Sequence, residues 1–276
     1  GREIVIETTI DRNSVRLILG DNQMIPLTSK HEVAILNTKG ILHSEGLRTL
    51  NYTYVKRDSL ENVSEYHTLI VPKGERQKVI FSDSSWVVLN AQSTMKYPVV
   101  FRGKERKVYV EGEAYFEVTR DEKYPFVVSV KNFDVRVLGT SFNVMSYDDE
   151  FASSVTLLSG KVETTSGHDT VRLSPGEQVS ITSDNRMTVQ KTDINVVVSW
   201  MDGKFGFSNE RLDVIMRKIC RWYDVEVLYA VPGIRERRFT GAPASNMPLK
   251  ELLEALSTTT NLQFSLQDGV ITIKQN

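Results

Sequence analysis

Three glutamates, Glu111, Glu113 and Glu117, share the odd-numbered positions of one short segment, residues 108–118. Paired carboxylates act as general acid and base, so this segment could line the groove of a carbohydrate-binding or glycan-processing protein of the cell envelope. Apolar residues and one glycine fill the even positions, and such alternation predicts a β-strand with one buried and one solvated face. Because no nucleophile or histidine lies nearby in sequence, we interpret the glutamates as the solvated face and keep the glycan alternative open.

The peptide bond between Gly139 and Thr140 is a second place where chemistry could occur. The Thr140 hydroxyl could attack the Gly139 carbonyl and move the acyl group from nitrogen to oxygen, which gives an ester that water cleaves easily. This reaction needs a strained turn and a nearby base. A Gly-Thr pair before a strand is also an ordinary turn, and the residues alone leave both interpretations open.

The sequence predicts neither a metal site nor a cofactor site. The histidines His31, His43, His67 and His168 are scattered, and none has a second His or Cys at ligand spacing. We therefore expect each of them to be a surface or loop residue. Cys220 is the single cysteine, which excludes an internal disulfide and a thiolate cluster, and no phosphate-binding glycine loop is present.

Composition narrows the class of protein. A chain of 276 residues has room for about two domains. The formal net charge of -1 gives no electrostatic reason to expect a nucleic-acid partner. No run of about 18 apolar residues occurs, so no segment is expected to span a bilayer. A single cysteine does not distinguish the cytoplasm from the periplasm.

Many short strands are predicted from Arg2 to about Val189, because apolar residues alternate and turn residues recur at roughly eight- to twelve-residue spacing. Residues 15–27 align without gaps on residues 77–89, and each copy is a strand, a turn led by Asp, and a second strand. The Asp carboxylate fits that turn because it can accept a hydrogen bond from the amide two residues later. These units predict a mainly β domain that is either a twisted sandwich or a solenoid-like β-stack.

After about Gly203 the apolar period becomes helical. Residues 208–219 align without gaps on residues 245–256, and each copy opens with Ser-Asn, which we expect to cap a helix. The apolar stripes are Leu212, Ile215, Met216 and Ile219 in the first copy and Leu249, Leu252, Leu253 and Leu256 in the second. With the strands expected around them, this pattern predicts a small α/β module, a repeated β-α-β unit with two helices on one small sheet.

We therefore divide the chain into three parts. Residues 1–65 are expected to add N-terminal strands to the β-domain, residues 66–193 to form the main all-β domain, and residues 194–276 to form the α/β module. From the residues alone, an adhesin or a cell-wall scaffold stays open as another class of protein.

Several motifs stand in one fixed order along the chain: residues 72–75, 83–90, 110–118, 125–126, 138–144, 158–162, 173–178 and 200–205. In this order they resemble the FecR-type anti-sigma regulators, and the C-terminal module looks like the small domain, akin to the secretin and TonB N-terminal domain, that follows in these proteins. The resemblance covers the chain closely from about Tyr66 onward and loosely before it. One departure is Asp83-Ser84-Ser85, where the family usually has Asp-Gly-Ser, and this puts the turn type in question.

The resemblance implies a regulator anchored in the inner membrane of a Gram-negative cell. Its cytoplasmic segment holds an extracytoplasmic-function sigma factor, and its periplasmic part senses the N-terminal signalling domain of a TonB-dependent outer-membrane transporter for iron or another nutrient. This chain looks like the periplasmic part, and since it opens with Gly1 we expect a membrane anchor upstream. Some members cleave themselves at a Gly-Thr bond, so Gly139–Thr140 is a candidate bond for one self-cleavage in a chain otherwise not expected to be an enzyme.

The resemblance also suggests where the partner binds. A small sheet with a free edge can accept a strand from another chain, and the partner in this family is itself a similar β-α-β module. By analogy we expect the partner at the strand formed by Arg237, Arg238, Phe239 and Thr240.

Overall fold

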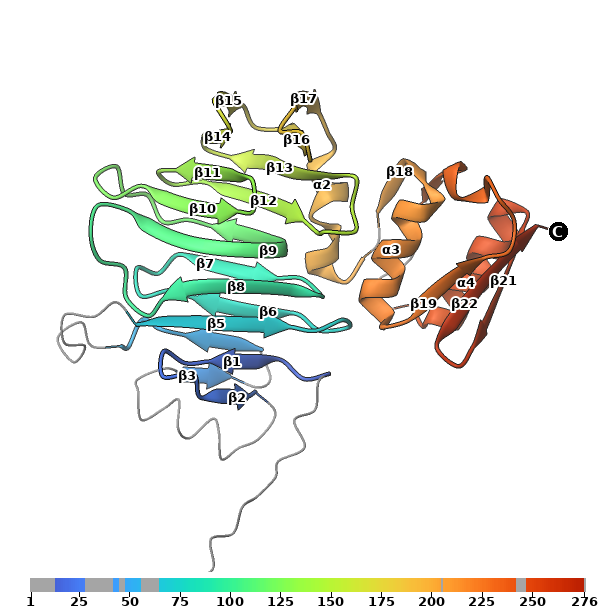
Figure 1. Cartoon of the computed structure of the whole chain (residues 1–276), viewed down its shortest axis with the longest axis horizontal. Helices are drawn as coiled ribbons and strands as arrows, with labels where there is room; N and C mark the ends of the chain where they lie inside the picture. The colour runs from blue at the N-terminus through green and yellow to red at the C-terminus, as the bar shows by residue number, and fades with distance from the viewer. Residues whose placement is uncertain are drawn as a thin grey trace, which may run out of the picture.

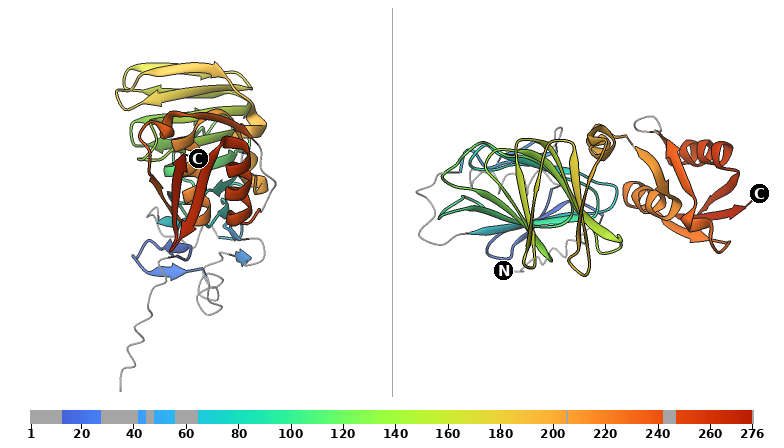
Figure 2. Two further views of the ribbon diagram at one scale, coloured as in Figure 1. Left: turned by 90° about the vertical axis from the view of Figure 1, so that its right-hand side faces the viewer. Right: turned by 90° about the horizontal axis from the view of Figure 1, so that it is seen from above.

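The computed structural model describes residues 13–27, 42–44, 48–55, 65–204, 206–241 and 247–275. Figure 1 shows two parts: a stack of β-strands, and a smaller module of helices and strands beside it. Seen from above in Figure 2, the strands of the stack form two layers. The predicted fold class, a mainly β domain followed by a small α/β module, is confirmed.

The stack consists of two sheets that face each other. In order across the first, sheet A, the strands are β2 (Met24–Pro26), β1 (Arg16–Ile18), β5 (Tyr66–Val71), β8 (Ser93–Pro98), β9 (Arg106–Glu117), β10 (Phe126–Val130), β11 (Phe133–Val137), β14 (Val162–Ser166) and β15 (Asp169–Leu173). In order across the second, sheet B, they are β3 (Leu42–Ser44), β4 (Thr49–Asn51), β6 (Gln77–Ile80), β7 (Trp86–Leu89), β9 again, β12 (Ser141–Ser146), β13 (Ala152–Ser159), β16 (Glu177–Thr182) and β17 (Met187–Lys191). After β5 the chain places one or two strands in one sheet and then crosses to the other, so the sandwich is built in the manner of a solenoid.

Strand β9 belongs to both sheets and changes from one to the other at Gly112. Before Gly112 it pairs with β8 and β10, and from Gly112 onward it pairs with β12 and β7. The φ of Gly112 is +96°, and a Cβ there would lie 2.8 Å from the Ser93 Cα. A glycine is needed at this corner because a side chain would meet the backbone of β8.

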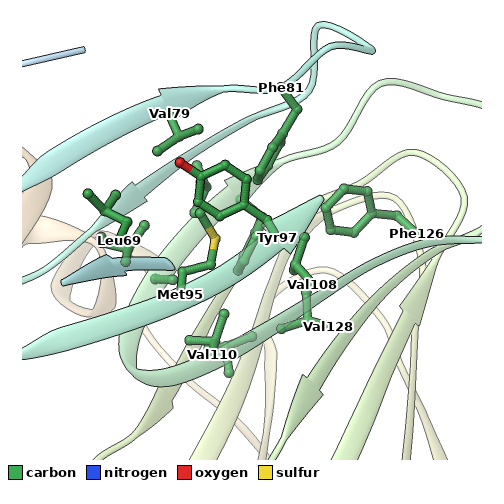
Figure 3. Packing of buried hydrophobic residues seen from close by; sticks show 14 of the residues in the cluster. Leu69, Val79, Phe81, Met95, Tyr97, Val108, Val110, Phe126 and Val128 are labelled. Carbon is green, nitrogen blue, oxygen red and sulfur yellow. The ribbon is translucent and has the colours of Figure 1, made fainter. Parts of the chain in front are cut away.

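The core of the sandwich lies between the two sheets. The even-numbered apolar residues of β9 and its end are all buried, as the alternation predicts: Val108, Val110, Ala114, Phe116 and Val118. Figure 3 shows part of this core, where Phe81, next to β6, packs edge to face on Tyr97 of β8 with ring centroids 5.6 Å apart. Phe116 stacks on Phe142 of β12 at 5.2 Å. The Phe81–Tyr97 pair joins the two layers, whereas the Phe116–Phe142 pair joins neighbouring strands of sheet B.

The two aligned strand-turn-strand units have the turns that the sequence predicts. Asp21 and Asp83 each accept a hydrogen bond of 3.0 Å from the amide two residues later. Asn22 and Ser84 follow them with φ of +66° and +68°. Ser84 thus adopts the left-handed conformation that a glycine would adopt there, and the serine leaves the turn unchanged.

The C-terminal module contains two helices and five strands among the described residues. They are β18 (Phe207–Arg211), α3 (Leu212–Tyr223), β19 (Glu226–Tyr229), the 3-10 turn η3 (Ile234–Glu236), β20 (Arg238–Gly241), α4 (Leu249–Thr260), β21 (Leu262–Gln267) and β22 (Val270–Gln275). Its strands form two small sheets where one was expected: β18 pairs with β20, and β22 lies between β19 and β21. Both helices bury their apolar stripes against these strands.

The predicted cap of the first helix is wrong. Ser208 and Asn209 lie in β18, and the N-cap of α3 is Arg211, whose side chain makes no capping hydrogen bond. Phe207, Glu210 and Arg211 pair with β20 around a bulge in which Asn209 has φ +47°, and this distant contact overrides the local capping preference of Ser-Asn. The second predicted cap, residues 245–246, lies outside the described residues.

A short linker joins the two parts. It contains α2 (Ile194–Val197) and the 3-10 turn η2 (Ser199–Asp202), and Asp193 caps α2 by accepting a hydrogen bond from the Asn195 amide. Across the part of the chain that the structure describes, every helix is too short or too polar to cross a lipid bilayer.

Candidate partner-binding strand and domain interface

The three glutamates of β9 lie in different surroundings. Because β9 changes sheet at Gly112, Glu111 lies exposed in sheet A, whereas Glu113 and Glu117 lie in sheet B. The interpretation that all three share one face is wrong, since the two-residue period does not register a change of sheet. Glu117 accepts a hydrogen bond of 2.8 Å from Ser141 and stands about 13 Å along the strand from Glu113. This is the arrangement of a scaffold strand.

Glu113, like Glu117, is half-buried. Its two oxygens accept hydrogen bonds from the side-chain amides of Asn90 (2.8 Å) and Asn143 (3.0 Å). Burial raises the pKa of Glu113, while these amides and the charges of Lys218 and Arg221 act in the opposite direction. Two cations of the C-terminal module therefore act electrostatically on a carboxylate of the sandwich.

The Gly139–Thr140 bond lies just before β12. Thr140 is 4% exposed, and its backbone pairs with Val118 in both directions. Its hydroxyl donates to the carbonyl of Lys161 at 2.9 Å. Gly160 packs on this bond so closely that a Cβ there would lie 2.7 Å from the Gly139 carbonyl oxygen. The structure thus places the bond in an enclosed, hydrogen-bonded strand.

His67 differs from the sequence-based expectation. It lies in β5 and is 1% exposed, so the prediction of a surface or loop position is wrong for this histidine. Tyr52 contacts its Nδ1 at 2.9 Å, and Glu65 contacts its Nε2 at 3.1 Å. Glu65 lies only two residues before His67, whereas Tyr52 comes from a separate segment that the sequence does not connect with this histidine. Among the described residues, no group of three or more His, Cys, Asp or Glu is arranged to hold a metal ion.

Strand β20 contains three of the four residues expected to bind a partner. Arg238, Phe239 and Thr240 lie in it, and Arg237 directly precedes it. The Arg237 carbonyl accepts a hydrogen bond from the Leu212 amide, and the Thr240 hydroxyl accepts one of 2.8 Å from the Asn209 amide. Within the described residues β20 pairs only with β18, and its other edge carries no paired strand.

The first helix of the module meets the β-sandwich at an acidic turn. Glu150, in the turn between β12 and β13, accepts hydrogen bonds from Arg217 (2.7 and 2.9 Å) and from Arg221 (2.7 Å) of α3. Arg221 also pairs with Asp149, and its guanidinium lies 3.8 Å from the centre of the Tyr147 ring. Burial lowers the pKa of Arg221, but the two carboxylates outweigh it and the pKa is raised.

Comparison with known proteins finds a family match in the sandwich and a second one in the C-terminal module. Residues 67–163 match the family described as FecR protein, and residues 204–273 match the family described as FecR, C-terminal. The chain belongs to the FecR family. Two crystal structures of a "putative anti-sigma factor" from Parabacteroides distasonis ATCC 8503, at 1.65 and 2.50 Å resolution, are similar to it, with 30% and 29% identity and TM-scores of 0.71 and 0.72. Each comparison covers 76% of this chain and 99% of the other chain. No curated protein sequence matches.

The FecR match begins in β5 and ends in β14, so it includes strands of both sheets. The FecR C-terminal match includes all five strands of the α/β module. The contact of Glu150 with Arg217 and Arg221 therefore joins the two matched regions of this FecR chain.

The contact of Glu150 with Arg217 and Arg221 was not predicted from the sequence. Its residues carried a partial signal, because Arg217 and Arg221 stand four apart on the polar side of the apolar stripe, and residues 148–150 form an acidic run. Opposite charges on distant segments are compatible with many pairings, and only the fold selects this one.

Proposed function

We propose that this FecR-family chain is the periplasmic, signal-sensing part of an anti-sigma factor that is anchored in the inner membrane. Two observations support the proposal: the FecR and FecR C-terminal regions follow each other in one chain, and a crystal structure described as a "putative anti-sigma factor" is 30% identical and 99% covered. The signal comes from the N-terminal signalling domain of a TonB-dependent outer-membrane transporter, and the output is control of an extracytoplasmic-function sigma factor by a cytoplasmic segment. Both partners, the transporter and the sigma factor, are proposed from the resemblance to the FecR-type anti-sigma regulators.

The free edge of β20 is the proposed contact for the signalling domain. Strand addition uses backbone hydrogen bonds, and β20 offers backbone groups on the side away from β18. Since the Arg237 carbonyl points toward α3, the period of two directs the backbone groups of Arg238 and Thr240 to the free edge. Arg237 and Arg238 are exposed beside this edge and favour a partner strand with acidic side chains.

A pair of substitutions at Thr240 tests this contact. Thr240→Pro removes an amide from the free edge, whereas Thr240→Ala keeps the amide and loses only the hydroxyl contact with Asn209. We expect the proline variant to bind purified transporter signalling domains at least about tenfold more weakly in calorimetry, and the alanine variant to bind nearly as wild type. Equal affinity of all three proteins would exclude this edge.

The function itself is tested by capture from the native cell. The immobilised chain should retain the signalling domain of a TonB-dependent transporter, and a reporter of the cognate sigma factor should respond when the transporter is loaded. An adhesin or a glycan-binding protein would show neither result.

Self-cleavage at Gly139–Thr140 is a separate proposal. Its support is the position of the hydroxyl, which lies next to the scissile bond and is held by the Lys161 carbonyl. If cleavage occurs, wild type and Thr140→Ser should give two fragments on a denaturing gel and Thr140→Val one band. Single bands for all three would end the proposal.

A further inference from the structure

The two modules of the chain touch through polar groups and do not share a core. The apolar core of the sandwich and that of the C-terminal module are separate clusters. Between them lies the contact of α3 with the acidic turn between β12 and β13. Figure 1 shows α3 on the side of the C-terminal module that faces the sandwich. Polar interfaces of this kind are typical of domains that move relative to each other.

The acidic turn is the principal contact. The side chain of Glu150 is 6% exposed and that of Arg221 is 7% exposed, so both charges have left water. Arg217 contacts one oxygen of Glu150 through two nitrogens, and Arg221 contacts the other oxygen. Desolvation offsets much of the attraction in such a buried cluster, but loss of one partner leaves an uncompensated charge.

A second contact comes from the turn between β5 and β6. The Gly74 amide donates to the Arg221 carbonyl at 2.8 Å, and Lys73 pairs with Glu226 at 2.9 Å. Arg76 donates to the Trp200 carbonyl in the linker and covers the Trp222 ring at 4.4 Å. Both turns therefore hold α3 and its C-terminal end by charge and hydrogen bonds.

The interface between these contacts is not close-packed. A cavity of about 520 Å³ lies between sheet B, the linker and α3, with Glu113, Val197, Trp200 and Lys218 among its lining residues. Three buried polar atoms in lining residues have no partner within the described chain: Asn143 Oδ1, Trp200 Nε1 and Arg221 Nε. The cavity therefore separates α3 from sheet B between the two contacts.

We propose that the contacts of Asp149 and Glu150 with Arg217 and Arg221 are a latch, and that its opening lets the C-terminal module swing away from the sandwich about the linker, residues 192–204. The closed state is held by charges that water can solvate again in the open state, so the two states lie close in free energy. β18 runs directly into α3, and a strand added to β20 would therefore act on the element that carries the latch. This last link rests on the proposed function, whereas the latch itself does not.

An engineered disulfide supplies the closed reference state. A Cβ built on Gly74 lies 4.0 Å from the Cβ of Asp224, within the range of disulfide bonds. The double variant Gly74→Cys and Asp224→Cys, made with Cys220→Ala to remove the native thiol, should lock the modules when oxidised. The same protein after reduction is its own control.

Charge reversal supplies the open state. Glu150→Arg places a cation against Arg217 and Arg221 and should open the latch. The further changes Asp149→Arg, Arg217→Glu and Arg221→Glu exchange the charges of both sides, restore two opposite pairs and should close it again. Small-angle scattering of the whole chain without a partner measures the radius of gyration at two salt concentrations. At about 0.01 M salt charges interact over about 30 Å, and at about 1 M salt they interact over about 3 Å.

We expect wild type to scatter like the oxidised protein at low salt and to show a larger radius of gyration at high salt. Glu150→Arg should show the larger radius in both, and the charge-exchanged protein should return to the wild-type radius at low salt. Circular dichroism checks that each variant is folded. Identical scattering of wild type, Glu150→Arg and the locked protein at both salt concentrations would overturn the latch. Because no partner is present, this result does not depend on binding at β20.

Discussion

Replacing Gly112 by Ala tests whether β9 changes sheet where the structure places the change. Gly112 has φ +96°, and a Cβ there would lie 2.4 Å from Ser93 Oγ and 2.8 Å from Ser93 Cα. Ser93 Oγ also accepts a hydrogen bond of 2.9 Å from the Glu113 amide. The substitution therefore strains the backbone, crowds β8 and disturbs that hydrogen bond together.

The magnitude follows from these three effects. An alanine with positive φ costs about 1–2 kcal/mol, and overpacking against backbone costs about 1–3 kcal/mol. A disturbed hydrogen bond adds about 1 kcal/mol. We expect Gly112→Ala to lower the free energy of unfolding of the sandwich by about 3–6 kcal/mol.

Gly103→Ala is the matched control. Its φ is +93°, and no atom lies within 4 Å of a Cβ built there, so only the backbone strain applies. Urea unfolding followed by circular dichroism in the β region should show a loss of about 1–2 kcal/mol for this variant. Equal losses for Gly103→Ala and Gly112→Ala would refute the close approach of β9 to β8.

Three further predictions concern the sandwich. Arg106→Met should lower the free energy of unfolding by about 3 kcal/mol, because Arg106 is 5% exposed and pairs with Asp83 at 2.7 Å. A loss of less than about 0.5 kcal/mol in urea unfolding, as for an ordinary surface substitution, would contradict this prediction. Ser84→Gly should raise the stability by up to about 1 kcal/mol by relieving positive φ, whereas Asn22→Gly should change it little, since Asn tolerates that conformation. Burial raises the pKa of Tyr115 to about 12, so the folded state favours the neutral form of this side chain. The free energy of unfolding should therefore be constant below pH of about 10 and fall between pH of about 10 and 12. Urea midpoints that do not change over this pH interval would contradict the prediction.

Local features of the fold could be predicted from sequence where the cause lies within a few residues. The Asp-led turns follow from the reach of a carboxylate to the amide two residues later, and both Asp21 and Asp83 make that bond. The burial of Phe116 and Val110 follows from alternation along one strand. The cap of α3 could not be predicted, because the pairing of β18 with β20 joins segments that local preference does not connect.

The buried face of β9 and the apolar stripes of α3 and α4 can be predicted from residue order, because they depend only on the period of a strand or a helix. That β9 belongs to two sheets follows from the fold, because its alternation passes through Gly112 without a break. The contact of Glu150 with Arg217 and Arg221 also follows from the fold, since the period shows which face a charged residue occupies but not which distant segment packs there.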